Sequence, residues 1–261
     1  MIVETEGMVL KQVKAVNGRR MLVIFTKKYG KLSVGTGLSE KGKSKTALAI
    51  KPFTIGNYEL FKSRDFYNIN NASTKKTYYS LGEDIDKYMA ASYIMEWTDK
   101  ALAEDMALPL LYKQLLEFMD AIVERKGEYM TLVLAYQIKA LKIMGIMPYL
   151  DSCVNCGEKV DGKNFVISEG GAICKDCAHE LEEMEQGNLI FKGDFNIGEA
   201  IGFLEKKSFY ALQNISLKKE HMEVLQSFIK KYSKYYLDID NLKSESFIKG
   251  GNQNGNYFRN D

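Results

Sequence analysis

The feature that most constrains this chain is a pair of short cysteine motifs. Cys153 and Cys156 enclose two residues, as do Cys174 and Cys177, and these four are all the cysteines in the 261 residues. A two-residue gap lets both thiolates of a pair point toward one ion, and 17 intervening residues let the chain fold back on itself. Four soft thiolates in this arrangement favour Zn²⁺. The sequence therefore predicts one structural zinc ion held by all four cysteines.

Other uses of these cysteines stay open. A redox dithiol of the thioredoxin type needs one such motif beside a βαβ unit, whereas this chain has two motifs. Structural disulfides need an oxidising compartment, but residues 1–6 carry acids where a secretory signal carries bases. An iron–sulfur cluster would use the same ligands. His179 could replace one thiolate, although we expect it to face solvent on the next helix.

Charge is distributed unevenly along the chain. The formal net charge is only +2. Residues 1–76 hold 15 Lys and Arg against 5 Asp and Glu, which gives +10, whereas residues 77–152 give −5 and residues 153–261 give −3. A small basic domain joined to acidic ones is the electrostatic footprint of a protein that binds a polyanion. A solvated lysine-rich surface is the alternative.

Residues 2 to about 70 have the pattern of short strands separated by turns. The dipeptide Asn17-Gly18 is the strongest two-residue hairpin signal that a sequence can carry. Five short strands with interspersed glycines favour a small closed barrel, and the five-stranded OB-fold binds oligonucleotides through its face and loops. The predicted strands lie around 9–16 and at 21–25, 32–35, 53–61 and 66–69.

From Thr77 the apolar residues recur at spacings of three and four, which predicts helices. Gly145 and Pro148 act as stop signals after the third of them. The apolar run 132–135 indicates that this third helix is the most buried. The predicted helices span 81–97, 108–123, 129–144, 197–204 and 217–236.

Residues 37–44 (GLSEKGKS) match the phosphate-binding P-loop pattern G-x-x-x-x-G-K-[ST]. A P-loop needs a strand before it and a helix after it, so that backbone N–H groups can hold phosphates. Only residues 45–51 follow before Pro52, and the flanking pattern is that of an antiparallel barrel. A flexible basic loop is therefore favoured over a nucleotide-hydrolysing enzyme.

No grouping of residues in the sequence marks an enzyme. His179 and His221 lie on polar stretches without an identifiable nucleophile or orienting carboxylate. The apolar stretch that comes nearest to the length of a membrane span is interrupted by Lys139 and Lys142. We therefore expect a protein that is not an enzyme and has no membrane partner.

These patterns predict a multi-domain α+β protein. An N-terminal five-stranded OB-fold barrel is followed by a C-terminal α-helical bundle with an inserted four-cysteine zinc-binding segment. The tail is rich in Gly and Asn, and we expect it to be disordered. The predicted boundaries are 1–76 for the barrel, 77–152 and 179–249 for the two parts of the helical domain, 153–178 for the zinc-binding segment and 250–261 for the tail.

Several short segments, taken in their order along the chain, identify a protein family more specifically than any one of them does alone. They are residues 4–11 (ETEGMVLK), 25–33 (FTKKYGKLS), 42–45 (GKSK) with 51–54 (KPFT), Ala91-Ser92-Tyr93, the run 141–148 that leads into the first cysteine pair, and 242–244 (LKS) with Phe247. In this order they resemble the RecO family of bacterial DNA recombination mediators, over nearly the whole chain.

The resemblance implies a protein that binds single- and double-stranded DNA and anneals complementary strands. It also implies partnership with RecR and with single-stranded-DNA-binding protein, and so indirectly with RecA, which is loaded onto the coated strands. The expected location is the bacterial cytoplasm, in association with the nucleoid. A zinc-ribbon adaptor between proteins, without a direct DNA role, is the alternative.

A lysine-rich barrel attracts the phosphate backbone without reading bases. We expect its cations to act collectively, and we expect Tyr29 to offer a stacking ring because it lies in a turn. The predicted DNA-binding residues are Arg19, Arg20, Lys27, Lys28, Tyr29, Lys31, Lys41, Lys43, Lys45 and Lys51.

Overall fold

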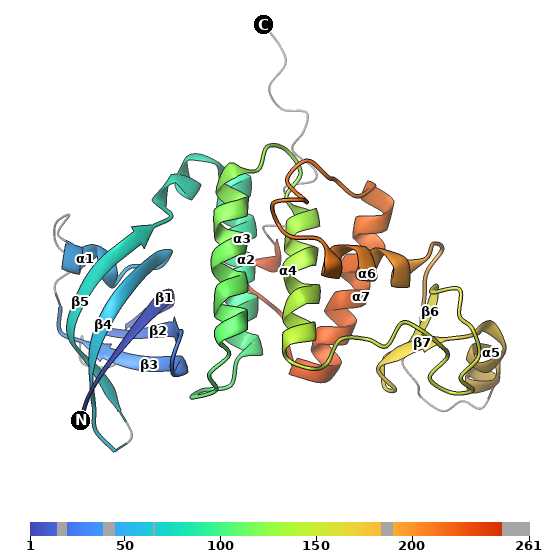
Figure 1. The fold of residues 1–261 in the computed structure, drawn as a ribbon, viewed down its shortest axis with the longest axis horizontal. Coiled ribbons are helices and arrows are strands. Elements are labelled where there is room, and N and C mark those ends of the chain that lie inside the picture. Colours follow the sequence, from blue (N-terminus) through green and yellow to red (C-terminus); the bar gives the residue numbers. More distant parts are fainter. Residues whose placement is uncertain (15–19, 39–44, 65, 184–189, 247–261) are drawn as a thin grey trace, which may run out of the picture. The chain divides into compact units, whose positions relative to one another are not determined.

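Strands dominate the first third of the chain and helices most of the rest, so the predicted mixed α+β composition is confirmed. The computed structural model describes residues 1–14, 20–38, 45–64, 66–183 and 190–246 (Figure 1). The chain divides into two compact units. The first holds Met1–Met119 and the chain from Asn241 on, and the second holds Asp120–Asp240.

The N-terminal strands pair in the order β1-β2-β3-β5-β4, and β4 also pairs with β1, so the sheet closes into a barrel (Figure 1). Neighbouring strands are antiparallel except β3 and β5, which run parallel where Val34 lies opposite Tyr67. Between Val9 and Lys11 the register of β1 against β2 shifts, as at a β-bulge, which bends a strand locally. The strands are β1 (Ile2–Lys14), β2 (Arg20–Thr26), β3 (Gly30–Thr36), β4 (Thr54–Lys62) and β5 (Tyr67–Thr77).

Apolar side chains that alternate along the strands fill the barrel. Leu32 and Val34 of β3 are buried, whereas their neighbours in the strand are partly exposed. Tyr58 of β4 is buried in the same core, and its hydroxyl donates to the carbonyl oxygen of Ala49 at 2.6 Å. Burial raises the pKa of Tyr58, so the hydroxyl remains a donor. This bond fixes the short helix α1 (Lys45–Ala49) to the barrel.

Helix α2 (Ile85–Ala101) packs beside β1 and is held to the barrel by one buried carboxylate. Asp84 caps its N-terminus by accepting hydrogen bonds from two backbone N–H groups of the first turn. Near its other end, Asp99 receives the Lys11 ammonium at 2.5 Å. Lys31 of β3 donates to the Asp99 carbonyl oxygen at 2.7 Å and lies 3.7 Å from its carboxylate.

The described chain ends by returning to α2. Glu96 accepts hydrogen bonds from the backbone N–H groups of Lys243 at 3.0 Å and Ser244 at 2.8 Å, and from the Ser244 hydroxyl at 2.5 Å. Burial raises the pKa of Glu96, but these hydrogen bonds outweigh it and lower the pKa below its ordinary value. The charged carboxylate thus anchors the C-terminal segment on the first unit.

In the second unit the central helix is α4 (Met130–Ile143), whose residues 132–135 are all buried, in agreement with their apolar run. The ring centroid of Phe228 in α7 (Lys219–Leu237) lies 4.9 Å from that of Phe165 and 5.3 Å from that of Phe191, and these contacts join the helix to a small sheet. The sheet has the order β7-β6-β8. Its strands are β6 (Asn164–Val166), β7 (Gly171–Ile173) and β8 (Ile190–Lys192).

Most helices begin and end close to the predicted positions. The first differs: the chain makes a 3₁₀ turn, η2 (Tyr79–Glu83), before Asp84 caps α2. The strands β6–β8 and the helix α1 had no prediction, because such short elements show no periodicity, whereas the helix expected around His179 is present as α5. In the described ranges, no helix combines the length and the apolar character needed to cross a membrane. The remaining helices are α3 (Pro109–Glu124), α4 (Met130–Ile143), α5 (Lys175–Glu183), α6 (Ile197–Lys206) and α7 (Lys219–Leu237).

Arg125 is a buried cation that holds a loop of the second unit. Its guanidinium donates to the carbonyl oxygens of Leu212 at 2.6 Å, Gln213 at 3.0 Å and Ile215 at 2.9 Å, and also to that of Glu128. Only 1% of its side chain is exposed. Burial lowers the pKa of Arg125, but a guanidinium stays charged in proteins. The loop therefore depends on this side chain for its hydrogen-bond donors.

Replacing Arg125 by Met should destabilise the protein by about 3 kcal/mol, because buried carbonyl groups lose their donors. The free energy of unfolding in urea, followed by circular dichroism of the whole chain, measures the change. Lys126→Met is the matched control, since the neighbouring Lys126 is exposed and its loss should cost no more than about 0.5 kcal/mol. Equal stability of the two variants would contradict the role assigned to Arg125.

Candidate metal centre and nucleic-acid interface

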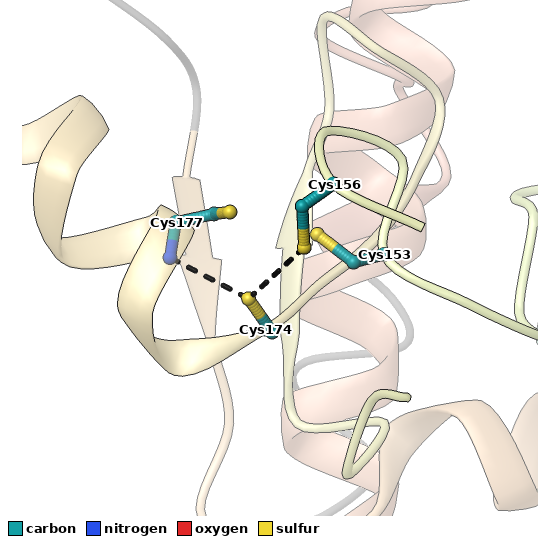
Figure 2. Close-up of side chains that lie close together, drawn as sticks. All are labelled: Cys153, Cys156, Cys174 and Cys177. Carbon is teal, nitrogen blue, oxygen red and sulfur yellow. Dashed lines mark hydrogen bonds between the residues drawn. The ribbon is translucent and has the colours of Figure 1, made fainter. Parts of the chain in front are cut away.

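The four cysteines converge on one point of the second unit (Figure 2). Their sulfur atoms all lie within 4.8 Å of one another, and the Sγ atoms of Cys156 and Cys174 are 3.8 Å apart. None of them forms a disulfide. The first pair precedes β6, Cys174 follows β7 directly, and Cys177 lies in the first turn of α5. The predicted meeting of the two pairs is confirmed.

Backbone hydrogen bonds shape the first cysteine pair into a tight turn. The N–H of Cys153 donates to the carbonyl oxygen of Glu158 at 2.8 Å, and the N–H of Gly157 donates to that of Cys153 at 2.9 Å. Gly157 has a φ of 79°, which glycine adopts without steric cost. In the second pair, the N–H of Cys177 points at the Sγ of Cys174 from 3.5 Å.

The strand β7 and the first cysteine pair are joined by backbone hydrogen bonds. Tyr149 donates to Gly170 and accepts from Ala172, both at 2.8 Å, and Val154 donates to Ala172 at 2.9 Å. Between them, Gly171 lies so close to the other segment that a Cβ atom would be 2.4 Å from the Val154 side chain and 3.0 Å from that of Tyr149. Glycine at this position therefore lets the two cysteine pairs approach each other.

The surroundings of Cys153 and Cys177 shift the pKa values of these two thiols in opposite directions. At Cys153, burial raises the pKa, but hydrogen bonds from the backbones of Cys156, Cys174 and Asn155 outweigh it and lower the pKa to about 6. At Cys177, the Asn155 side chain lowers the pKa, but burial and the neighbouring thiols outweigh it and raise the pKa to about 12. A metal ion would stabilise the negative charge on all four sulfur atoms together.

The geometry of the cluster fits one metal ion. A tetrahedron with zinc–sulfur bonds of about 2.3 Å has sulfur atoms about 3.8 Å apart, and the Sγ atoms of Cys156 and Cys174 have this separation. One side of the cluster packs on a small apolar core that includes Val166 and Ile173. The nearby His179 has an exposed ring whose Nδ1 lies 3.5 Å from a carboxylate oxygen of Glu183, as expected for a residue that faces solvent.

The predicted DNA-binding cations are described in part. Arg20 begins β2 and is half-buried, opposite Thr36 at the end of β3. Lys27 and Lys28 form the exposed turn between β2 and β3. The structural description does not extend to Arg19, Lys41 and Lys43, nor to the side chain of Lys45.

The turn that carries Lys27 and Lys28 borders a hollow of mixed charge on the barrel. Its lining also includes the carboxylates of Glu4, Glu6 and Glu59. Lys28 Nζ donates to the carbonyl oxygen of Glu4 at 3.2 Å. A polyanion is attracted less strongly by this mixed surface than by a purely basic one.

Two of the predicted contacts are engaged within the protein. Lys31 has 15% of its side chain exposed and binds Asp99. Tyr29 is half-buried against the barrel core, and its N–H donates to the Thr26 hydroxyl at 3.0 Å. Lys51 is different, because it lies shortly before β4 at the edge of a hollow lined by aromatic rings.

Two family models cover the chain almost from end to end. Residues 1–78 match the model described as Recombination protein O N terminal, which spans all five barrel strands. Residues 82–246 match Recombination protein O C terminal, which spans the helices α2 to α7 and the cysteine cluster. The chain belongs to the RecO family.

Curated RecO proteins match over nearly their full lengths. The DNA repair protein RecO of Thermoanaerobacter sp. (strain X514) is 30% identical, and the match covers 95% of this chain and 97% of that relative. The DNA repair protein RecO of Alkaliphilus metalliredigens (strain QYMF) is 28% identical, with 95% and 99% covered. That of Caldanaerobacter subterraneus subsp. tengcongensis is 29% identical, with 94% and 96% covered. The family resemblance read from short motifs is confirmed.

Gly171→Ala should push β7 away from the first cysteine pair and lower the free energy of unfolding by about 2 kcal/mol, as overpacking does. Hydrogen exchange should accelerate at the Val154 and Ala172 amides, which bond across this contact. Gly202→Ala is the control, because its Cβ would make an ordinary contact with Leu150 at 3.9 Å within a helix. Unchanged exchange in the Gly171 variant would refute the close approach described above.

Proposed function

We propose that this chain is a DNA repair and recombination mediator that binds single- and double-stranded DNA and anneals complementary strands. It would act with RecR on strands coated by single-stranded-DNA-binding protein and help RecA to load there. The observation that carries the proposal is membership of the RecO family over both halves of the chain. The +10 charge of residues 1–76 supports a DNA-binding role for the barrel, which we interpret as an OB-fold.

Annealing requires a surface that holds two polyanionic strands close together while their bases remain free to pair. Lysine side chains suit this task, because they neutralise phosphates without occupying the Watson–Crick edges of the bases. The protein would act by binding and not as an enzyme. ATP hydrolysis that depends on Lys43 would instead favour the P-loop interpretation of residues 37–44.

Contacts of the described cations suggest where DNA would bind on the barrel. Lys31 is engaged by Asp99, and the turn with Lys27 and Lys28 borders carboxylates. Lys51 follows the lysine-rich segment 41–45 in the sequence and lines a hollow without carboxylates among its described residues. We therefore place the main DNA contacts at residues 41–51, with the other cations in a supporting role.

Reversing charge in this segment should abolish DNA binding and annealing together. In Lys41/Lys43/Lys45→Glu, three cations that attract phosphates become anions that repel them. The measurements are the annealing rate of labelled complementary strands without ATP, and single-strand affinity across a salt range. Lys43→Ala, which removes one cation without adding an anion, should weaken binding modestly and reduce the slope of log affinity against log salt by about one.

The matched control is Lys126/Lys218/Lys219→Glu, which makes the same change in net charge at exposed positions of the second unit. It should anneal like the parent if the position of the charge matters. Equal annealing by the two folded triple variants would show that residues 41–45 have no special role, and salt-insensitive binding by the parent would favour the adaptor alternative.

We further propose that the cysteine cluster binds one Zn²⁺ per chain and that the ion serves folding. Four thiolate ligands leave no open coordination position for a substrate, which is the pattern of structural zinc sites. The separation of the sulfur atoms and the free thiols support this ion. The binding energy of the metal would contribute directly to the stability of the surrounding segment.

The affinity for zinc should fall as the pH is lowered. Near pH 7 the Cys153 thiol, with a pKa of about 6, is largely ionised, whereas Cys177, with a pKa of about 12, must release a proton to bind. Protons therefore compete with zinc throughout the neutral range, and more strongly below about pH 6, where Cys153 is protonated as well. Competition with a chromogenic chelator at several pH values measures this dependence.

The control for this prediction is a substitution beside the cluster that removes no ligand. Cys156→Ser should lose the metal, whereas Ser152→Ala should keep one zinc ion per chain, because Ser152 lies outside the cluster. Purified parent protein without stoichiometric zinc, and with four freely titratable thiols, would refute the metal proposal.

A further inference from the structure

A hollow of about 420 Å³ in the first unit has the composition of a site for an aromatic ligand. Its lining includes four aromatic rings, those of Phe53, Tyr78, Tyr79 and Tyr88, together with Lys51 and Gln12. The residues come from β1, from the segment before β4 and from the turn and helix after β5. Its volume is within the range of about 300–1,000 Å³ that small-molecule sites occupy, toward the small end.

The charge of the hollow suits an anionic ligand. Lys51 is the formally charged residue among the described ones that line it. A second hollow of about 630 Å³ shares Phe53 and Tyr88 with the first, and its lining includes Lys100 and Lys243 as well as the Lys11 that is paired with Asp99. Its two carboxylates are engaged by the protein: Asp99 by Lys11 and Lys31, and Glu96 by the backbone and hydroxyl at 243–244. A negatively charged chain that leaves the first hollow therefore meets carboxylates that already have partners within the protein, together with Lys100 and Lys243.

The aromatic rings are held in place before any ligand binds. Phe53 has a φ of 61°, a left-handed conformation that is strained for a bulky residue, and strained residues of this kind cluster at functional sites. Its carbonyl oxygen accepts from the Tyr78 N–H at 2.9 Å, and its ring lies 5.4 Å from that of Tyr88 at 44°. Tyr79 and Tyr88 remain 41% and 42% exposed, so ring surface is available to a ligand.

We propose that this hollow binds an unpaired base of single-stranded DNA between its aromatic rings, with the adjoining phosphate at Lys51. The inference rests on the proposed DNA-binding function and adds a stacking site to it. Base stacking on aromatic side chains tolerates every sequence, as an annealing protein requires. A base within a duplex is already stacked and paired, so the site should select single strands over double strands.

A nucleobase fits these observations better than a protein segment does. Lys51, which lines the hollow, follows the lysine-rich segment 41–45 closely in sequence. Both belong to residues 1–76, whose formal net charge is +10. Lys51 would bind a phosphate next to the rings that stack on a base, and a nucleotide carries both a phosphate and a base. A protein segment would need an aromatic side chain and an acidic one in the same arrangement.

The test compares two oligonucleotides of equal length and charge, oligothymidylate and its abasic counterpart, on the full-length protein at one salt concentration. The parent should bind oligothymidylate more tightly. Tyr79→Leu and Tyr88→Leu should each weaken that binding about 5- to 30-fold, equivalent to about 1–2 kcal/mol, and leave abasic binding unchanged. Tyr88→Phe should behave like the parent because it keeps the ring.

Phe66→Leu is the matched control, since Phe66 is 65% exposed in the same unit and does not line the hollow. A strand containing 5-iododeoxyuridine should crosslink, on irradiation, to Phe53, Tyr79 or Tyr88. Parental affinity for oligothymidylate in both Leu variants, or an equal loss on both oligonucleotides, would overturn the stacking site and leave the proposed function standing. A parent that binds neither strand would overturn both proposals.

Discussion

The first unit depends on the buried carboxylate of Asp99. A charge removed from water is costly unless cations and hydrogen bonds compensate it, and here Lys11 of β1 and Lys31 of β3 both reach it. Because the carboxylate belongs to α2 and both cations belong to the barrel, neither element can separate without leaving an uncompensated charge. The same helix carries Tyr88, so the ion pairs also fix one wall of the aromatic hollow.

This arrangement changes how the basic charge of the barrel should be understood. A count of side chains gives +10 for residues 1–76, but Lys11 and Lys31 are used to hold α2, and Lys28 is bonded beside a hollow that contains three carboxylates. The charge available to DNA is therefore smaller than the formal charge and lies elsewhere. Lys51 is a described cation that lines a hollow with aromatic residues and without carboxylates among its described lining. Position, and not number, decides which lysines can meet a phosphate.

Local patterns allowed much of the fold to be predicted, whereas contacts between residues distant in sequence could not be predicted from them. The spacing of apolar residues placed α3 and α4 within a residue of their observed bounds, and the spacing of the cysteines predicted their convergence. Nothing local links Lys31 to Asp99, which lies 68 residues away, so Lys31 was assigned to the DNA surface. The hollow likewise joins Gln12, Phe53 and Tyr88, which only barrel closure and the return of α2 bring together. The left-handed backbone of Phe53 has no signature in a sequence, because it is imposed by its surroundings.

The size of the cysteine segment explains why it would need a metal. Its strands β6, β7 and β8 have three residues each. Among the described residues, the buried cluster beneath the cysteines holds Val166, Ile173 and Ala178 beside the thiols Cys153 and Cys177, and a few partly buried apolar side chains, including Val160, Leu181 and Ile190, pack against it. Such a small core cannot offset the conformational entropy lost on ordering the segment. The hydrogen bonds that join Tyr149 and Val154 to β7 bring the two cysteine pairs together. This approach also concentrates four sulfur atoms, whose negative charges repel one another when the thiols ionise. A cation at the centre would turn that repulsion into attraction, so that the feature most unfavourable to the metal-free segment becomes its main source of stability.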